Sequence, residues 1–398
     1  MGVPKRALYV RQAPYPWDIR VDKFCTSLRQ HGWEVEIVAR RGPDQGSVAE
    51  TDGMAIHRVG PEQPRWISLP VPGNPLWQNV LDARLKAFKP DLLIARDVPM
   101  ALFTAHAASK AGVPWVLDMA EHYPAGMRSW KRYNTNPLLN LLVSTLRVPD
   151  LIERKGVSRA NGILVVCQEQ KDRLQRQYQV PPEQIEIIFN TPGKARFANI
   201  PDKSRNPLDI RFGYHGMISQ DRDLITVLRG FDIAAEKNPS IKLDVAGFGE
   251  SESDVRDEIA RLRHGDRITM SGSFTHADID RLYTDIDFGV CCCELSEFSE
   301  NAIANKYFDY AACGRPFLFT AQGPMVRLME HFQCGVAYRG GDPEAAANAI
   351  LQLVDADYST MAANGRRAVA QEYNWENDTT HMLEFFERVM AEHPSAGQ

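Results

Sequence analysis

Short apolar runs alternate with longer amphipathic segments along most of the chain, and this alternation limits the folds that the sequence can adopt. In the N-terminal half, such runs begin at Ala7, Glu34, Asp91, Trp115, Gly162 and Ile185. Strands that are apolar on both faces and are separated by helices predict a parallel sheet covered on both sides. Because crossover connections between parallel strands are right-handed, we expect a doubly wound α/β domain.

Residues 190–208 interrupt the alternation. They contain Thr-Pro-Gly, Ile-Pro-Asp and Arg-Asn-Pro without a period, which is typical of a linker. Apolar runs then restart at Ile210, Ile241, Ile268, Phe288, Pro316 and Gly335. The 398 residues also exceed what one hydrophobic core usually fills. The sequence therefore predicts two Rossmann-like, parallel-sheet domains facing each other across a cleft, with ligands at the carboxyl ends of the strands.

The predicted boundaries follow these breaks. Residues 1–192 form the N-terminal domain, 193–206 the linker and 207–375 the C-terminal domain. The last helix, near residues 373–390, carries an apolar stripe, so it packs either on its own domain or on the first one. We predict that residues 376–398 pack back on the N-terminal domain.

Composition excludes several classes of protein. The net charge of −5 does not fit a nucleic-acid-binding protein. The apolar run at 7–10 is too short for a signal peptide, and no run approaches the roughly 20 apolar residues of a membrane span. We therefore expect a cytoplasmic protein. Cys291, Cys292 and Cys293 are adjacent, so in a strand they cannot converge on one metal ion, and we interpret them as buried filler.

Residues 128–147 allow two interpretations. They are basic at the start and rich in leucine after Asn136. Such a segment either contacts the inner membrane surface or a lipid-linked acceptor, or forms a helix that packs on the sheet.

The strongest local signal is the stretch 305–316, which predicts a helix that ends at Gly314, a common C-cap residue. We expect the helix to open near Glu300. Acidic residues before it compensate the helix dipole in one interpretation. In the other, the helix N-terminus offers free N–H groups to a diphosphate, and Asp309 accepts hydrogen bonds from a ribose.

Residues 304–316 read Ala-Asn-Lys-Tyr-Phe-Asp-Tyr-Ala-Ala-Cys-Gly-Arg-Pro. This stretch resembles the signature of the GT-B glycosyltransferases, in particular the retaining family called family 4, with its context P-x-K-x-x-E-Y-x-A-x-G-x-P. The resemblance implies that Asp309 binds the ribose of a nucleotide sugar, and that the first family acid falls on Glu300 or Asn301. Ala302 and Lys306 belong to the same implied donor site.

Other motifs follow in the family's order and complete the implied donor site. Gly216 resembles the glycine loop after the first strand of the donor domain, and Arg222 takes the place of the basic residue near the diphosphate. Gly247 and Gly249 resemble the G-x-G after the second strand, although a tight turn alone explains such a pair. Ser273 and Phe274 stand where the family holds the nucleobase. Asp285 and Asp287 imitate a metal-binding Asp-x-Asp, which we reject because the resemblance implies that this segment only leads into a buried strand, as it does in the family.

In the N-terminal half, Asp118, Glu121 and His122 resemble the family's D-x-H-E region at a strand end, with Ala120 in place of the expected His. The resemblance implies contact with the donor sugar or the acceptor hydroxyl. The alternative is that Asp118 and Glu121 cap the following helix. Arg20, after the first strand, lies where it can reach the diphosphate or the acceptor.

The resemblance implies a retaining glycosyltransferase that needs no metal and no further cofactor. Its catalytic candidates are Asp118, Glu121, His122, Arg222 and Glu300. The donor is a UDP- or GDP-sugar and the acceptor a glycan or a lipid-linked glycan, in bacterial surface polysaccharide or glycolipid synthesis. Two alternatives stay open: a GT-B sugar-nucleotide epimerase, and a weakly catalytic sugar-nucleotide-binding subunit.

Overall fold

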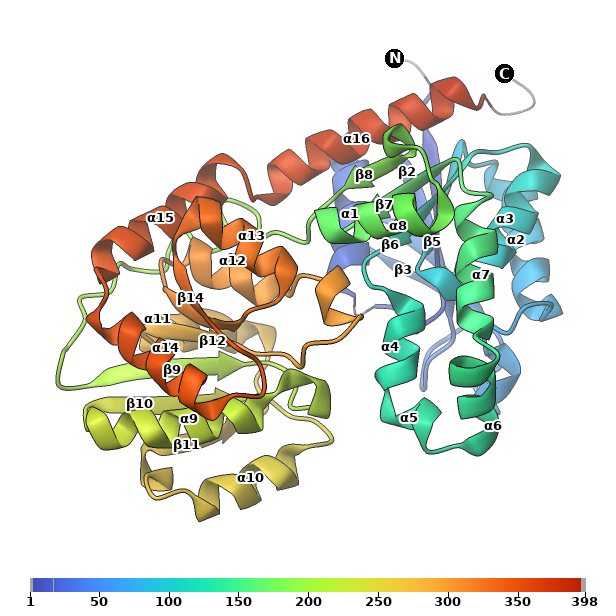
Figure 1. Cartoon of the computed structure of the whole chain (residues 1–398). Coiled ribbons are helices and arrows are strands. Elements are labelled where there is room, and N and C mark those ends of the chain that lie inside the picture. The colour runs from blue at the N-terminus through green and yellow to red at the C-terminus, as the bar shows by residue number, and fades with distance from the viewer. Residues whose placement is uncertain (1–2, 17, 395–398) are drawn as a thin grey trace. The chain divides into compact units, whose positions relative to one another are not determined.

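The computed structural model describes residues 3–16 and 18–394. Parts of the predicted termini (1–2 and 395–398) and residue 17 of the loop before Arg20 lie outside the described residues. The chain divides into two compact units, Met1–Ile188 with Thr379–Gln398, and Phe189–Asp378 (Figure 1).

In the part of the first unit that the structure describes, one eight-stranded sheet has the order β3-β4-β2-β1-β5-β6-β7-β8. All neighbouring strands pair in parallel except β3 and β4, which form an antiparallel hairpin. The strands are β1 (Arg6–Arg11), β2 (Glu34–Arg40), β3 (Val48–Thr51), β4 (Met54–Val59), β5 (Leu92–Arg96), β6 (Trp115–Met119), β7 (Gly162–Val165) and β8 (Ile185–Ile187).

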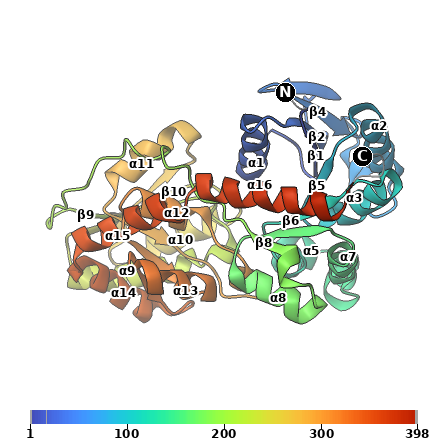
Figure 2. The same cartoon turned by 90° about the horizontal axis from the view of Figure 1, so that it is seen from above.

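Helices cover both faces of this sheet. Figure 2 shows α2, α3 and α7 on one face, and α1 and α8 on the other. The helices of the first unit are α1 (Ile19–Gln30), α2 (Pro75–Phe88), α3 (Val98–Ala111), α4 (Tyr123–Ser129), α5 (Lys131–Asn134), α6 (Pro137–Asn140), α7 (Val148–Val157) and α8 (Gln168–Tyr178). Short 3-10 or π turns are η1 (Arg65–Ser68), η2 (Leu141–Thr145) and η3 (Pro182–Gln184).

In the second unit, six strands among the described residues pair in parallel in the order β11-β10-β9-β12-β13-β14. They are β9 (Ile210–His215), β10 (Ile241–Ala246), β11 (Ile268–Gly272), β12 (Phe288–Cys291), β13 (Phe317–Thr320) and β14 (Gly335–Tyr338). The predicted fold class, two doubly wound parallel-sheet domains, is confirmed by these two sheets.

The helices of the second unit bury both faces of its sheet. Leu318 of β13 packs with one apolar cluster, and its neighbours Phe317 and Phe319 pack with another, as alternating strand side chains must. The helices are α9 (Leu224–Lys237), α10 (Glu252–Arg261), α11 (Ile279–Asp285), α12 (Asn305–Ala312), α13 (Gly323–Phe332), α14 (Pro343–Asp355) and α15 (Tyr358–Gln371). Helix α16 (Trp375–Glu392) begins in this unit and continues into the first. Short turns are η4 (Gln220–Arg222), η5 (Gly265–Arg267), η6 (His276–Asp278) and η7 (Ser299–Asn301).

Two segments near the predicted boundaries have defined places. Residues 193–206, expected as a linker, belong to the second unit, and their Phe197 and Ile200 are buried in its core. Helix α16 changes unit after Asp378, so that Thr379 onward belongs to the first unit. A Cβ atom on Gly162 of β7 would lie 2.7 Å from the Phe385 ring, which shows how closely this helix packs on the first sheet.

Candidate active site

Glycines let two loops at the carboxyl edge of the second sheet pack backbone against backbone. Ile218 N donates a hydrogen bond to Phe248 O at 2.9 Å. A Cβ atom on Gly247 would lie 1.8 Å from Gly216 O, and one on Gly249 would lie 2.0 Å from Ile218 O. The sequence assigned Gly247 and Gly249 to nucleotide binding. The structure gives a nearer reason for both glycines, which is contact between protein backbones.

We expect Gly247→Ala to destabilise the second unit by about 3 kcal/mol, because the atoms that the new methyl group meets are backbone atoms that cannot turn away. The melting temperature should fall by roughly 6–12 °C in calorimetry. The matched control is Gly341→Ala, where φ is +71° but nothing lies within 4 Å of the added Cβ. It should cost only the left-handed backbone penalty, about 1 kcal/mol. Equal losses in the two variants would contradict the packing argument.

Two positive side chains lie beside the Gly216 loop. The Lys306 ammonium stands 4.1 Å from the Tyr214 ring centre and 2.7 Å from the ideal Cβ position of Gly216. Burial lowers the pKa of Lys306, and the positive charge of Arg222 lowers it further. Lys306 makes no hydrogen bond or ion pair with the residues that the structure describes, and the guanidinium of Arg222 approaches Asp221 only to 3.8 Å. The site therefore holds more positive charge than its own acids neutralise.

The N-terminus of α12 adds to this positive site. Its N-cap residue, Ala304, has no capping side chain. Within the described part of the chain, the backbone N–H groups of Asn305 and Lys306 donate to no acceptor. Free N–H groups at a helix N-terminus favour an anion. The arrangement is suited to a diphosphate.

The sequence predicted that this helix opens near Glu300, but α12 starts only at Asn305. Residue 300 lies in η7, and Ala302 and Ala304 have extended backbone before α12 starts at Asn305. The Glu300 carboxylate accepts a hydrogen bond from Gly323 N at 2.8 Å, at the start of α13.

Both candidates for the first family acid, Glu300 and Asn301, make hydrogen bonds within the protein. Glu300 holds the start of α13, and Asn301, 8% exposed, donates its Nδ2 to Glu297 O at 2.8 Å. The neighbouring Ala302 offers its carbonyl to Gln322 Nε2 at 2.9 Å. These contacts assign a structural task to each of the three residues.

Asp309 lies one turn after Lys306 on α12, so the two side chains share a helix face. Its Oδ2 accepts a hydrogen bond from Tyr283 OH at 3.4 Å, and the side chain is half-buried. Ser273 is exposed after β11, and the Phe274 ring stands edge-on to His215 with centres 6.4 Å apart. The end of β9 is therefore the common neighbour of these groups. Tyr214 and Gly216 contact Lys306, and His215 contacts Phe274 and the Tyr283 ring that binds Asp309.

Sequence reasoning missed His215, although it directly precedes Gly216. The imidazole is 3% exposed, and burial with the nearby charge of Lys306 lowers its pKa to about 3. Nδ1 lies 3.4 Å from Tyr310 OH, whereas Nε2 has no partner among the described residues. The ring is therefore neutral. Its position at a strand end, where ligands gather in such sheets, was the available signal.

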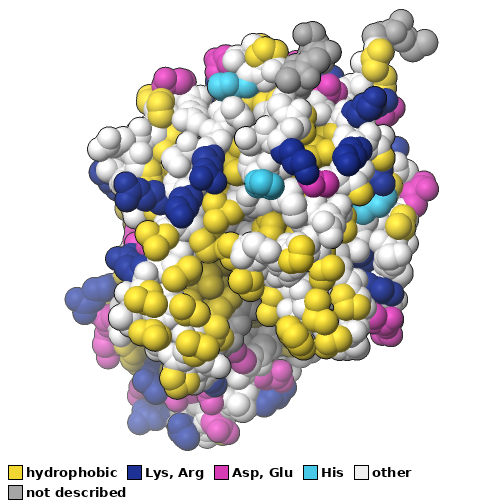
Figure 3. Space-filling model, turned by 90° about the vertical axis from the view of Figure 1, so that its right-hand side faces the viewer, with side chains coloured by type: hydrophobic (Ala, Val, Ile, Leu, Met, Phe, Trp, Pro, Cys, Tyr) yellow, Lys and Arg dark blue, Asp and Glu magenta, His cyan; other side chains and the backbone are white. Residues whose placement is uncertain are grey.

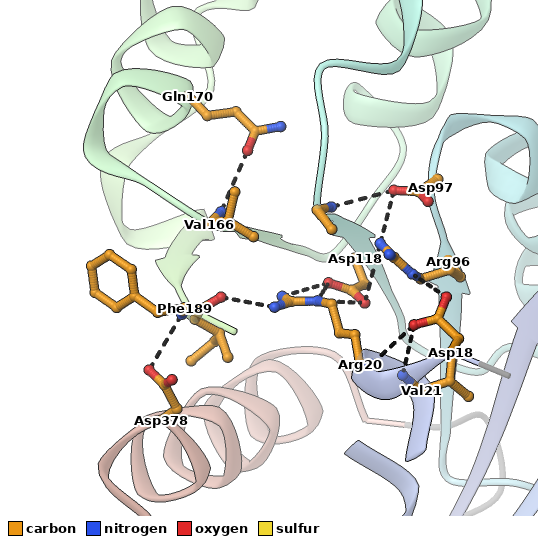
Figure 4. Close-up of polar contacts among 12 residues, drawn as sticks. Asp18, Arg20, Val21, Arg96, Asp97, Asp118, Val166, Gln170, Phe189 and Asp378 are labelled. Atoms are coloured by element: carbon orange, nitrogen blue, oxygen red, sulfur yellow. Dashed lines mark hydrogen bonds and ion pairs between the residues drawn. The ribbon is translucent and has the colours of Figure 1, made fainter. Parts of the chain in front are cut away.

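In the first unit, Asp118 lies between two arginines at the carboxyl edge of the sheet (Figure 4). Its Oδ1 lies 2.7 Å from Nη2 of Arg20, and its Oδ2 accepts from Tyr9 OH at 2.6 Å and lies 4.0 Å from Nη1 of Arg96. Arg20 also donates to Ile188 O at 3.0 Å. Asp118 is 0% exposed and Arg20 1%. Both side chains are thus committed to a buried ion-pair network rather than presented to a ligand.

His122 is committed in the same way. It is 1% exposed, and its Nδ1 lies 3.6 Å from Glu153. Glu153 also accepts from Arg173 at 2.6 Å. Burial raises the pKa of Glu153, but the contacts with His122 and Arg173 outweigh it and lower that pKa to about 2. His122 is the N-cap residue of α4, but its side chain makes no capping hydrogen bond.

Among Asp118, Glu121 and His122, only Glu121 is half-buried rather than fully buried. The charge of Glu121 acts on Asp97, a buried carboxyl group that the sequence did not point to. Asp97 follows β5 with φ +61°, and its Oδ1 accepts from Arg96 and from Ala120 N, at 3.0 and 3.3 Å. Burial raises the pKa of Asp97 to about 7, and the charge of Glu121 contributes to the rise.

Comparisons with known proteins agree with this geometry. Residues 19–191 match the model of the glycosyl transferase 4-like domain, and residues 209–356 match glycosyl transferases group 1. The chain is a family 4-like glycosyltransferase with the GT-B fold. The two matched domains correspond to the two sheets, and the implied donor motifs all lie in the second.

Three similar proteins differ widely from this chain in sequence. Mannosylfructose-phosphate synthase of Agrobacterium fabrum is 22% identical over 184 residues, which cover 42% of the enzyme and 39% of that relative. Sucrose-phosphate synthase from Thermosynechococcus elongatus superposes with a TM-score of 0.76 at 15% identity, over 98% of this chain and 100% of that one. HepE of Anabaena, solved with UDP, gives a TM-score of 0.70 at 15% identity, over 96% and 100% of the two chains.

The buried cysteines of the glycosyltransferase fill space beside the positive site. Cys291, Cys292 and Cys293 are 3–7% exposed, and burial raises the pKa of each thiol. The thiols are therefore protonated and unreactive at neutral pH.

The Asp287 carboxylate, 1% exposed, accepts a hydrogen bond from Arg211 N at 2.8 Å at the start of β9.

Proposed function

We propose that this glycosyltransferase takes its sugar from a UDP- or GDP-sugar held by the second unit, without a metal ion. The observation that carries the proposal is the pair of cations, Lys306 and Arg222, beside the uncapped N-terminus of α12. Breaking the bond between the sugar and the diphosphate leaves negative charge on the diphosphate. Fixed positive groups that meet this charge lower the barrier. Because the chain supplies them itself, a metal ion has no necessary task.

Asp309 is the proposed ribose ligand, one helical turn from the phosphate-binding Lys306. A carboxylate accepts hydrogen bonds from two adjacent hydroxyl groups, and Tyr283 OH holds Asp309 from one side. The structures of HepE with UDP and with UDP-glucose support a uridine nucleotide as the first donor to test.

We propose retention at the anomeric carbon and transfer to a glycan or lipid-linked glycan, in bacterial surface polysaccharide or glycolipid synthesis. The enzyme works in the cytoplasm with peripheral contact to the inner membrane surface. On the acceptor side, Glu121 is the better candidate for contact with substrate, because Asp118 and His122 are enclosed by ion pairs.

A panel of nucleotides and nucleotide sugars, added with and without EDTA, tests the donor proposal by thermal shift. One ligand at a hundred times its dissociation constant should stabilise the enzyme by about 2.7 kcal/mol. The corresponding rise in melting temperature is roughly 5–10 °C. EDTA should leave the rise unchanged. No response to any nucleotide, or a response that needs a divalent ion, would contradict the proposal.

Product analysis separates the alternatives. Incubation with the donor alone should leave its sugar unchanged, whereas an epimerase would convert it. With a glycan acceptor, NMR of the product should show the anomeric configuration of the donor. Tight donor binding without turnover on any acceptor would favour the weakly catalytic binding subunit.

A further inference from the structure

One segment of the first unit exposes leucine side chains to solvent. Residues 137–151 span α6, η2 and the start of α7. The exposed fractions are 64% for Leu138, 46% for Leu141, 54% for Leu146 and 53% for Leu151. Figure 3 shows hydrophobic side chains gathered on the lower part of this side of the molecule. Several exposed leucines within a short segment indicate a surface that meets another apolar phase.

The same segment is basic, in an acidic chain. Residues 128–155 contain six Lys or Arg and two Asp or Glu, although the whole chain carries −5. On α7, Leu151 stands three and four residues before Arg154 and Lys155, so the three exposed side chains share one helix face. Glu153 points away from that face, into the buried pair with Arg173.

Positive charges on α5 and α7 are available to a partner. Lys131, Arg154 and Lys155 are exposed and form no ion pair with the residues that the structure describes. Leucines beside uncompensated basic residues are the combination that binds bilayer interfaces, where the apolar chains enter the acyl boundary and the cations meet lipid phosphates. In a self-association, the same positive charges would face each other and repel.

We infer that residues 131–155 form a lipid-binding surface, which places Leu138, Leu141, Leu146 and Leu151 in the interface of a bilayer containing anionic lipids. The inference rests on the membrane contact in the proposed function, but not on the donor site. No helix of the described residues is long and apolar enough to cross a bilayer, so the contact is peripheral. It would bring the first unit to acceptors whose lipid anchor holds them at the membrane.

Vesicle flotation with the full chain tests this inference. The protein should float with vesicles of phosphatidylcholine mixed with phosphatidylglycerol, and not with phosphatidylcholine alone, and high salt should release it. The triple variant Leu138→Ser, Leu141→Ser and Leu151→Ser should bind at least about tenfold more weakly, since each leucine loses its burial in the membrane. Leu208→Ser is the matched control, because Leu208 is 81% exposed in the second unit, and it should bind like the wild type.

Three results would overturn the inference: absence of binding to the mixed vesicles, equal binding by the triple variant, or a solution dimer that the triple variant dissociates. Light scattering measures the last of these. The nucleotide-induced thermal shift, measured on the same variant, shows that it is folded. If that shift is present while flotation fails, the membrane surface is wrong and the donor proposal stands.

Discussion

Lys306→Met is expected to lower kcat/KM for the donor sugar by about a thousandfold. Methionine keeps the apolar stem over the Tyr214 ring and removes the charge beside the Gly216 loop. Removing one donor that stabilises developing negative charge typically costs a hundred- to a thousandfold, and here a full charge is removed. The nucleotide-induced thermal shift should shrink in parallel.

The same variant should be more stable than the wild type without ligand, because an ammonium without an acidic partner is costly to bury. The pKa of Lys306 is lowered in the folded state. The unfolded chain therefore binds the proton more tightly, and the stability deficit of the wild type should disappear as pH rises above the folded-state pKa. Denaturation of both proteins at neutral and alkaline pH measures this. Lys242→Met, which removes a half-exposed lysine paired with Asp209, is the control and should change neither property. A Lys306→Met protein that is less stable than the wild type would give Lys306 a structural task instead.

Asp118→Asn is expected to cost about 3–5 kcal/mol of stability, since it leaves Arg20 and Arg96 charged and buried without their shared carboxylate. The melting transition of the first unit should fall by roughly 10 °C. Nucleotide binding should persist where the variant is still folded, because the proposed donor site lies wholly in the second unit. Calorimetry and a nucleotide titration measure the two effects.

Asp82→Asn supplies the comparison for this result. Asp82 pairs with Lys110 near the surface of the same unit, and its loss should cost about 1 kcal/mol or less. If Asp118→Asn instead has wild-type stability and no transfer activity, Asp118 contacts the donor sugar or the acceptor, as the sequence predicted. In that case the carboxylate acts on substrate, and its ion pairs open during the reaction.

The sequence predicted the sheets well because their signal is local. The apolar run that begins at Glu34 is β2 (Glu34–Arg40), and Gly314 follows the end of α12 with φ +61°. The antiparallel β3–β4 hairpin was missed, although Asp52-Gly53, both with positive φ, is a common hairpin turn. The start of α12 was misplaced because residues 302–304 have no helix-breaking residue type to mark their extended backbone.

The candidate site was predictable only where a residue's task depends on its place at a strand or helix end. The sequence placed Lys306 and Asp309 on α12, where the structure has them, and their roles in donor binding stay predictions, as does that of Arg222. The environments of Asp118 and His122 were not predictable, because they are made by Arg20, Arg96 and Glu153, which are distant in sequence. A motif tells which residue types follow a strand, but not whether an arginine from another segment has already enclosed the carboxylate.

Because most of α16 belongs to the first unit, that unit cannot finish folding until translation has passed through the second unit. The first unit is assembled from both ends of the chain, Met1–Ile188 and Thr379–Gln398. The nascent N-terminal sheet therefore waits through translation of the entire second unit before Phe385 and Val389 arrive to cover Gly162. During that interval an apolar strip over β7 has no cover, and such exposure invites chaperones or aggregation.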